Sequence, residues 1–159
     1  MAALALKQEL DRYLVKKYEE KILDTQFEQL QRIQEADNPG FVAEMLQLFI
    51  DEIEKQILDN IDPRNDQEKR NEKRDAQKKR VESYVHRLKG SSVSVGSYQI
   101  TIACNEFRHA SEQRDMVGFQ RALTKIIDEF YRVKEVFNKI IELEEKIYEL
   151  STASAPQQN

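Results

Sequence analysis

The chain has 159 residues, a net charge of −4 and 34% charged side chains, which favours one globular domain and disfavours non-specific binding to nucleic acid. One cysteine excludes an intramolecular disulfide framework, and two histidines leave little for a histidine-based metal cluster. Four glycines and three prolines indicate few turns and therefore long helices, and no apolar run approaches the ~20 residues of a membrane span.

The first part of the chain predicts two short helices. Its start is amphipathic and unlike a signal peptide, so we expect an intracellular protein. The first helix has apolar residues at helical spacing: Leu6, Leu10, Tyr13, Leu14 and Tyr18. The second begins near Asp24, because Thr25 and Glu28 fit a capping box. Its inner residues are Phe27, Leu30 and Ile33.

A third helix follows the sequence Asn38-Pro39-Gly40. Asn38 is suited to cap it and Pro39 to occupy its first helical position. Its apolar residues keep one strong period: Val42, Met45, Leu46, Phe49, Ile53, Ile57 and Ile61. Asp62-Pro63 then marks a turn.

Residues 62–80 differ from the rest of the chain in charge. They carry a net charge of +3, whereas residues 1–61 carry −6, and Ala76 is their one apolar residue. The segment is therefore expected to be a solvated loop or a projecting helix. Five interleaved acidic residues and the lack of an aromatic residue favour a solvated face over a nucleic-acid patch.

Three more helices complete the pattern. The fourth emerges from the basic segment and runs to about Val95, before Gly96; Ser97 can cap the fifth and Asp115 the sixth. The inner residues of the fourth are Val81, Val85, Leu88, Ser92 and Val95. Those of the fifth are Ile100, Ala103, Cys104, Phe107 and Ala110. Those of the sixth, which reaches Leu150, are Phe119, Leu123, Ile126, Phe130, Val133, Phe137, Ile140 and Ile147.

The expected fold is all-α. Residues 1–150 form a single domain, with an antiparallel four-helix bundle over roughly 40–150 and two short additional helices over roughly 4–36. Residues 151–159 lose the apolar pattern and are expected to be a disordered tail.

One segment of the fourth helix contains several residues that destabilise a helix. Gly90 costs about 1 kcal/mol relative to alanine inside a helix, and three serines nearby are weak helix formers. His86, Lys89, Gly90 and Val93 fall on one face, away from the inner residues. An accessible histidine, a notch one turn later and a nearby cation suit a nucleophile that handles an anionic group. A plain surface histidine and a glycine that permits close packing are the alternative.

Other candidate residues carry no motif. His109 is expected at the polar edge of the fifth helix, and Cys104 is expected to be a small core residue. Glu82, one turn before His86, is the nearest carboxylate, and we expect it to be a solvated surface acid. No acidic cluster beside His86 can hold a metal ion.

Residues 86–96, HRLKGSSVSVG, closely resemble the signature HQxKGSSxSxG of plant-type histidine-containing phosphotransfer (HPt) proteins. Residues 22–30 and 38–42, with Leu48-Phe49, resemble parts of the second and third helices of that family. Residues 104–108 and 129–134 match later blocks, and the resemblance covers about residues 4–150.

The resemblance implies a six-helix fold with a C-terminal four-helix bundle and a role in a multistep phosphorelay. A receiver domain of a sensor hybrid histidine kinase gives its phosphoryl group to His86, which passes it to the aspartate of a response regulator. The resemblance is to plant carriers that serve cytokinin receptors, and such carriers move between the cytosol and the nucleus. The chain itself needs no cofactor or metal, since Mg²⁺ is expected on the receiver domain.

The resemblance also implies roles for neighbouring residues. Lys89 stabilises charge on the phosphoryl oxygens, Gly90 lets the receiver's aspartate loop approach, and Ser91 can hydrogen-bond neighbouring groups. Ser92 is expected to have an inward, structural role. Two features depart from the family: Arg87 replaces the usual glutamine and can alter phosphate affinity or partner preference, and residues 62–80 are longer and more charged.

The leading prediction is a monomeric phosphate carrier in the cytoplasm and nucleus that binds neither nucleic acid nor membrane. It is not an ATP-using kinase, because its four glycines are too scattered to cradle a nucleotide. A receiver-binding decoy or scaffold that carries no phosphate is the main alternative. A third possibility is a helical scaffold whose basic segment contacts nucleic acid or anionic lipid.

Overall fold

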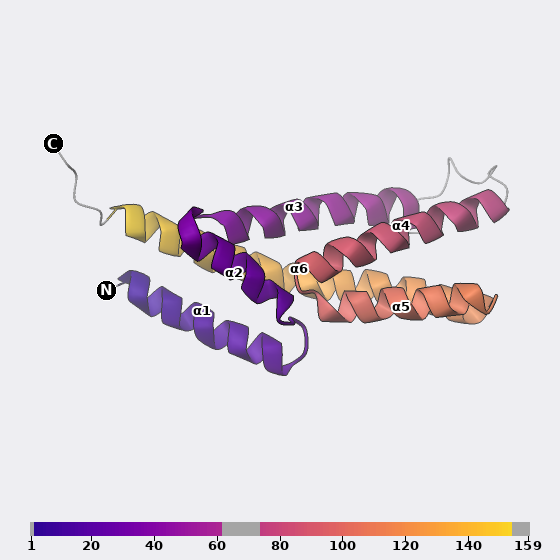
Figure 1. The fold of residues 1–159 in the computed structure, drawn as a ribbon, viewed down its shortest axis with the longest axis horizontal. Helices are drawn as coiled ribbons and strands as arrows, with labels where there is room; N and C mark the ends of the chain where they lie inside the picture. Colours follow the sequence, from indigo (N-terminus) through magenta and orange to yellow (C-terminus); the bar gives the residue numbers. More distant parts are fainter. Residues whose placement is uncertain (1, 62–73, 154–159) are drawn as a thin grey trace.

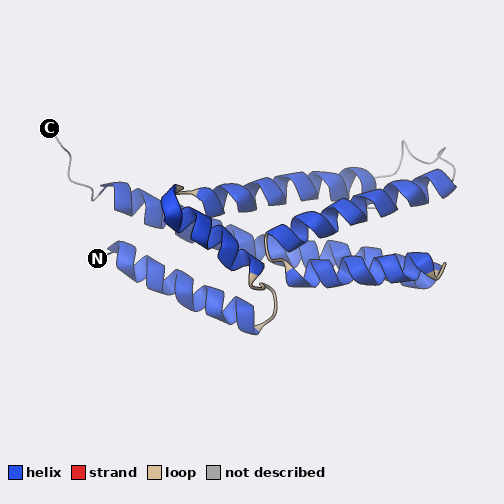
Figure 2. Cartoon of the chain, in the orientation of Figure 1, coloured by secondary structure: helices blue, strands red, loops and turns tan. Residues whose placement is uncertain are grey.

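The computed structural model describes residues 2–61 and 74–153, which consist of helices and short connections (Figure 2). The elements are α1 (Ala2–Glu19), α2 (Gln26–Asp37), α3 (Phe41–Gln56), the π-helical turn η1 (Ile57–Ile61), α4 (Arg74–Ser94), α5 (Tyr98–Glu112) and α6 (Met116–Ala153). The all-α prediction is confirmed. The α1 helix, with 18 residues, is longer than the sequence pattern indicated.

The long α6 helix organises the fold. It contacts α1, α3 and α5, and α4 packs against α5, α3 and η1 (Figure 1). The helices α3 to α6 thus form a four-helix bundle. Figure 1 shows α1 beside the C-terminal half of α6, where Lys139 Nζ lies 3.6 Å from Glu9 Oε1. The α2 helix packs on α3 and α4.

One apolar core runs through the molecule, and the predicted inner faces form it. The inner residues expected for the fourth, fifth and sixth helices are all buried, including Ser92 at 0% exposure. In the second and third helices two expectations are corrected: Ile33 is 45% exposed and Met45 is only half-buried. The period of the apolar residues therefore predicts the core, except at Ile33 of α2 and Met45 of α3.

Local capping patterns predict only some of the contacts that hold the helix starts. At α2 the Thr25 side chain makes no capping hydrogen bond; the Gln26 N–H is donated to Asp24 Oδ1 instead (2.9 Å). The predicted cap of α6 is confirmed, because the Gly118 N–H is donated to Asp115 Oδ1 (2.9 Å). Ser97 precedes α5 as expected, but its buried side chain makes no capping hydrogen bond.

The start of α3 is two residues later than predicted. Gly40, at φ 85°, is the N-cap residue, so the expected roles of Asn38 and Pro39 are wrong. The Val42 N–H is donated to Gln34 Oε1 of α2 (2.9 Å), and Gln34 Nε2 donates to Glu144 Oε2 of α6 (2.9 Å). A side chain from another helix thus replaces the local cap.

A second junction fixes the end of α4. The Asp24 N–H is donated to the Gly96 carbonyl (3.0 Å), and Leu23 pairs with Ser97 in an isolated antiparallel bridge. Gly96 has φ +75°, and a β-carbon there would lie 2.6 Å from the Phe27 backbone nitrogen. Glycine is required at this position, since both the backbone angle and the close approach exclude a side chain.

The predicted basic segment and the predicted tail are only partly covered by the described residues. Residues 62–73 and 154–159 lie outside the described residues, so the predictions of a solvated segment over 62–80 and a disordered tail over 151–159 concern mainly those positions. Residues 74–80 form the first turns of α4, and α6 continues three residues past Leu150. Among the described helices, none is both long and apolar enough to cross a membrane.

Candidate functional site

His86 lies near the middle of α4 on its outer face. Its side chain is exposed, while Val85 and Leu88, on the inner side, are each 3% exposed. Neither ring nitrogen of His86 has a hydrogen-bond or ion-pair partner in the described part of the chain. The imidazole is therefore held by the helix alone and is open to an incoming group.

Gly90 lies one turn after His86 and is exposed. A β-carbon at this position would meet no atom within 4 Å, so close helix packing does not explain the glycine. The Gly90 carbonyl accepts a hydrogen bond from Ser94 Oγ (3.1 Å), so the polar atom near this position is a backbone oxygen that is already bonded. An unneeded glycine inside a helix costs about 1 kcal/mol relative to alanine. The open space beside His86 is thus kept at a cost in stability.

Lys89 lies on the side of α4 that faces α5. It is half-buried and forms no ion pair with any described residue, so its ammonium group is available to a ligand. Its charge is felt by the Cys104 thiol of α5, but burial dominates and raises the pKa of Cys104 to about 12. Cys104 is 2% exposed and neutral, and belongs to the core.

The structure divides the predicted support residues between two sides of α4. Gly90 shares the outer face with His86, and Lys89 flanks that face toward α5. Arg87 and Ser91 lie on the other flank, where they line a groove toward α3. Ser91 therefore does not share the His86 face, and Ser92 is fully buried. The one-residue step from His86 to Arg87 turns about 100° around the helix, which explains the separation.

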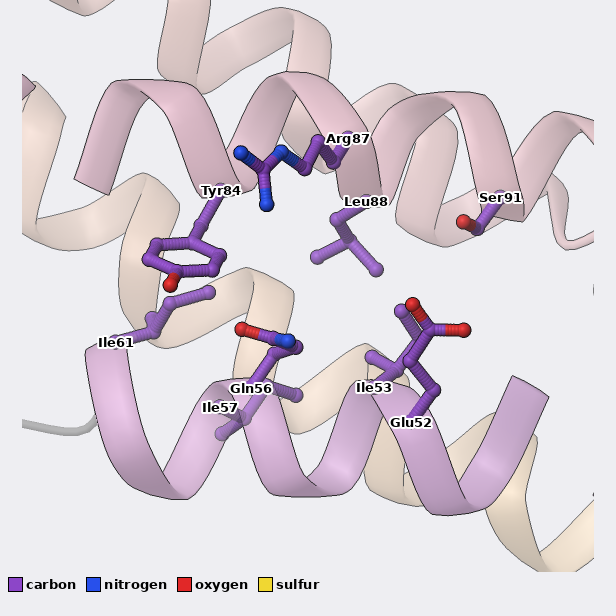
Figure 3. Close-up of a pocket in the computed structure, with 9 residues that line it drawn as sticks. All are labelled: Glu52, Ile53, Gln56, Ile57, Ile61, Tyr84, Arg87, Leu88 and Ser91. Carbon is purple, nitrogen blue, oxygen red and sulfur yellow. The ribbon is translucent and has the colours of Figure 1, made fainter. Parts of the chain in front are cut away.

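The groove between α3 and α4 was not predicted from the sequence. It is a cavity of about 40 Å³, lined by nine residues: Glu52, Ile53, Gln56, Ile57, Ile61, Tyr84, Arg87, Leu88 and Ser91 (Figure 3). The exposed Arg87 guanidinium lies 5.5 Å from the centre of the Tyr84 ring. In the sequence, the one sign of this contact is that Tyr84 and Arg87 are three positions apart, which makes them neighbours on a helix.

Other polar groups near the site are already engaged. Ser111 Oγ donates to Glu82 Oε1 (2.6 Å), and Lys78 Nζ lies 3.8 Å from the same oxygen. Glu82 is therefore an interhelical contact of α4 with α5 rather than a free surface acid. His109 lies at the exposed end of α5. Within residues 2–61 and 74–153 no group of three or more potential ligands could hold a metal ion.

Comparison with known proteins identifies the family. The Hpt domain family matches residues 44–151. Histidine-containing phosphotransfer protein 1 of Oryza sativa subsp. japonica is 36% identical over 147 residues, which span 92% of this chain and 95% of the relative. The chain belongs to the family of plant-type histidine-containing phosphotransfer proteins. Histidine-containing phosphotransfer protein 1 of Arabidopsis thaliana is also 36% identical, over 80% of this chain and 79% of its own.

Solved HPt structures share the fold. The crystal structure of an HPt protein from maize has a TM-score of 0.71 and 33% identity, and covers 89% of this chain and 99% of its own. That of an HPt protein from Medicago truncatula has a TM-score of 0.74 and 28% identity, with 95% and 96% covered. Pseudo histidine-containing phosphotransfer protein 6 of Arabidopsis thaliana is 28% identical over 89% of this chain and 88% of its own. The similarity thus includes both HPt and pseudo-HPt proteins.

Proposed function

We propose that the protein is a phosphorelay intermediate that carries a phosphoryl group on His86. The observation that carries this proposal is the exposed, unpartnered His86 imidazole beside Gly90, whose missing side chain no packing contact explains. The chain's membership of the HPt family supports it. The donor is an aspartyl phosphate on the receiver domain of a hybrid histidine kinase, and the acceptor is the aspartate of a response regulator.

The transfer step is an in-line displacement. The lone pair of His86 Nε2 attacks the phosphorus of the aspartyl phosphate, an N–P bond forms, and the P–O bond to the aspartate breaks. The aspartate leaves as a carboxylate, and the ring proton of His86 stays on Nδ1 until the imidazolium loses it to solvent. The reverse displacement, by the aspartate of the next receiver, empties His86 again. Transfer in both directions is possible because both phosphorylated groups are reactive.

The residues around His86 have separate tasks in this reaction. The missing side chain of Gly90 leaves room for the receiver's aspartate loop. The Lys89 ammonium, free of any ion pair among the described residues, offsets the negative charge on the phosphoryl oxygens. Arg87 and Ser91 border the groove beside the site, so they contact the partner rather than the phosphorus. The Mg²⁺ that neutralises the aspartyl phosphate is supplied by the receiver domain.

The chain acts as a carrier and not as an ATP-dependent kinase. Its relay serves sensor kinases of the cytokinin-receptor type, and it works as a monomer in the cytoplasm and the nucleus, without binding nucleic acid or membrane. The similarity to plant HPt proteins supports the proposed pathway, oligomeric state and location. They can be tested by following phosphotransfer from cytokinin-activated receptors and by locating a tagged chain in cells.

The decisive experiment incubates the protein with a phosphorylated receiver domain. Wild-type protein should acquire a label that is labile in acid and stable in alkali, as expected for phosphohistidine. His86→Gln should acquire none, and His109→Gln, which changes the other histidine, should label normally. Undiminished labelling of His86→Gln would refute the role of His86.

A decoy that binds receivers without carrying phosphate is the second candidate. The similarity to a pseudo-HPt protein favours it, as does Arg87 at the position where the family usually has glutamine. The labelling experiment separates the two functions. An unlabelled wild-type protein that still binds the receiver would establish the decoy.

A further inference from the structure

The groove between α3 and α4 combines an apolar floor with a polar rim. Its floor includes three buried side chains: Ile57, Ile61 and Leu88. A volume of about 40 Å³ suits the end of one side chain, since cavities that bind small molecules usually measure some 300 Å³ or more. Figure 3 shows Tyr84 and Ile61 at one end of the groove and Glu52 and Ser91 at the other.

Arg87 places an uncompensated positive charge on the rim. Its guanidinium group lies 5.5 Å from the centre of the Tyr84 ring, a distance at which the cation and the aromatic face attract each other. No carboxylate in the described part of the chain pairs with it. The guanidinium group therefore offers its N–H donors to an anion in a position that Tyr84 helps to fix.

Gln56 supplies a second donor from the opposite helix. Asn60 Nδ2 donates to Gln56 Oε1 (3.0 Å), so the Gln56 amide oxygen is occupied while its NH₂ group remains available. Figure 3 shows the Gln56 amide across the groove from Arg87. Two donors that border the groove from facing helices match an ionised carboxylate, which only accepts hydrogen bonds. The Glu52 carboxylate lies at the other end of the groove and would repel an acidic side chain of the partner, so that side chain is expected at the Arg87 end.

We propose that this groove receives an aspartate or glutamate side chain of the docking receiver domain, and that Arg87 is the residue that selects such receivers. The inference rests on the proposed function, because it takes a receiver as the partner. Arg87 follows His86 directly and lies about 100° around the helix, so a surface that covers His86 also reaches the groove. A glutamine at this position, usual in the family, would lack the charge and would not discriminate in favour of an acidic residue.

The test measures binding without phosphate. The probe is the isolated, unphosphorylated receiver domain of a hybrid kinase that labels the wild-type protein, titrated calorimetrically at low and high salt. Arg87→Gln should weaken binding about tenfold at low salt and reduce the salt dependence, since a charge pair at an interface rim acts in this way. Arg87→Glu should weaken it further. Arg121→Gln, at an exposed arginine of α6 without an ion pair among the described residues, is the matched control and should bind normally.

A second set of variants identifies the acid. Each exposed aspartate and glutamate near the receiver's phosphorylated aspartate is changed to its amide. One of these changes should weaken binding as much as Arg87→Gln does and add no further loss in combination with it. Equal affinities of Arg87→Gln and Arg121→Gln, or the lack of any acid coupled to Arg87, would overturn the proposal. The proposal would also be overturned if sedimentation showed that Arg87→Gln binds the receiver more weakly because the variant chain self-associates.

The two proposals fail in different ways. If His86→Gln still accepts phosphate, the proposed function is wrong, whatever the calorimetry gives. If labelling is confined to His86 and Arg87→Gln binds like the wild type, the carrier function stands and the selective role of Arg87 is refuted.

Discussion

Gly90 leaves open space one helical turn from His86, although nothing in the fold requires a glycine there. A β-carbon at Gly90 would have no neighbour within 4 Å, and its backbone is that of an ordinary helix. The alternative that glycine permits close helix packing is therefore excluded for this position. Under the proposed function, this space admits the receiver's aspartate loop to the His86 imidazole.

Substitutions at Gly90 should separate stability from transfer. We expect Gly90→Ala to raise the free energy of unfolding by about 1 kcal/mol and Gly90→Leu to raise or preserve it, because both residues favour a helix over glycine. Gly90→Leu should slow phosphotransfer at least tenfold, because its side chain fills the space beside His86, and Gly90→Ala should slow it less. Urea unfolding and the rate of labelling measure the two effects. Wild-type transfer by Gly90→Leu would contradict the role of the open space.

Gly96 and Gly40 form a matched pair that tests the α4–α5 junction. Both have positive φ, but a β-carbon at Gly40 meets nothing, whereas one at Gly96 lies 2.6 Å from the Phe27 backbone nitrogen. Gly40→Ala should cost about 1 kcal/mol of stability from backbone strain alone. Gly96→Ala should cost distinctly more, about 3 kcal/mol or above, because the backbone of α2 must also move. Equal losses in urea unfolding would show that the close approach does not contribute.

The sequence predicts the helices and the exposed face that holds His86 well, because both depend on local spacing. The inner stripes of α4, α5 and α6 and the exposure of His86 follow from a period of 3.6 residues. Gly90 stands out in the sequence because a helix interior normally avoids glycine. These features need no knowledge of which helices are neighbours.

The sequence does not predict the features that join distant segments. The cap of α3 comes from Gln34 of α2, so the local signal at Asn38 and Pro39 gave a start two residues too early. The groove at Arg87 is lined by Gln56 of α3 as well as by Tyr84 of α4. It forms where α3 passes into the π-helical turn η1, a change of helix type that apolar periodicity does not reveal.

Lys89→Gln should slow phosphotransfer by a modest factor. An ammonium group that is only partly buried contributes about 1 kcal/mol, so we expect a three- to tenfold lower rate at low salt and a smaller effect at high salt. Lys79→Gln is the control. Lys79 is exposed on the same side of α4 but two turns, about 10 Å, before His86. If both variants slow transfer equally, the effect comes from the general charge of α4 and not from Lys89 at the site.

Glu144 should make stability fall as the pH rises above the usual range of a carboxyl group. Burial raises the pKa of Glu144, and the hydrogen bond from Gln34 only partly offsets this. The folded protein thus holds a proton at Glu144 at pH values where the unfolded chain has lost it. Since the folded state then binds more protons, the free energy of unfolding falls between the ordinary carboxyl pKa and the raised one.

Glu144→Gln should remove this pH dependence. The amide oxygen can still accept the Gln34 Nε2 hydrogen bond, so the link between α2 and α6 is kept while the buried charge is lost. The variant should therefore equal or exceed the wild type in melting temperature at pH 7, with the difference shrinking toward pH 4. Glu145→Gln, at an exposed position next to it, should leave the profile unchanged. A wild-type melting temperature that rises between pH 5 and pH 7 relative to Glu144→Gln would show that the Glu144 carboxylate is stabilised in the fold, contrary to the effect of its burial.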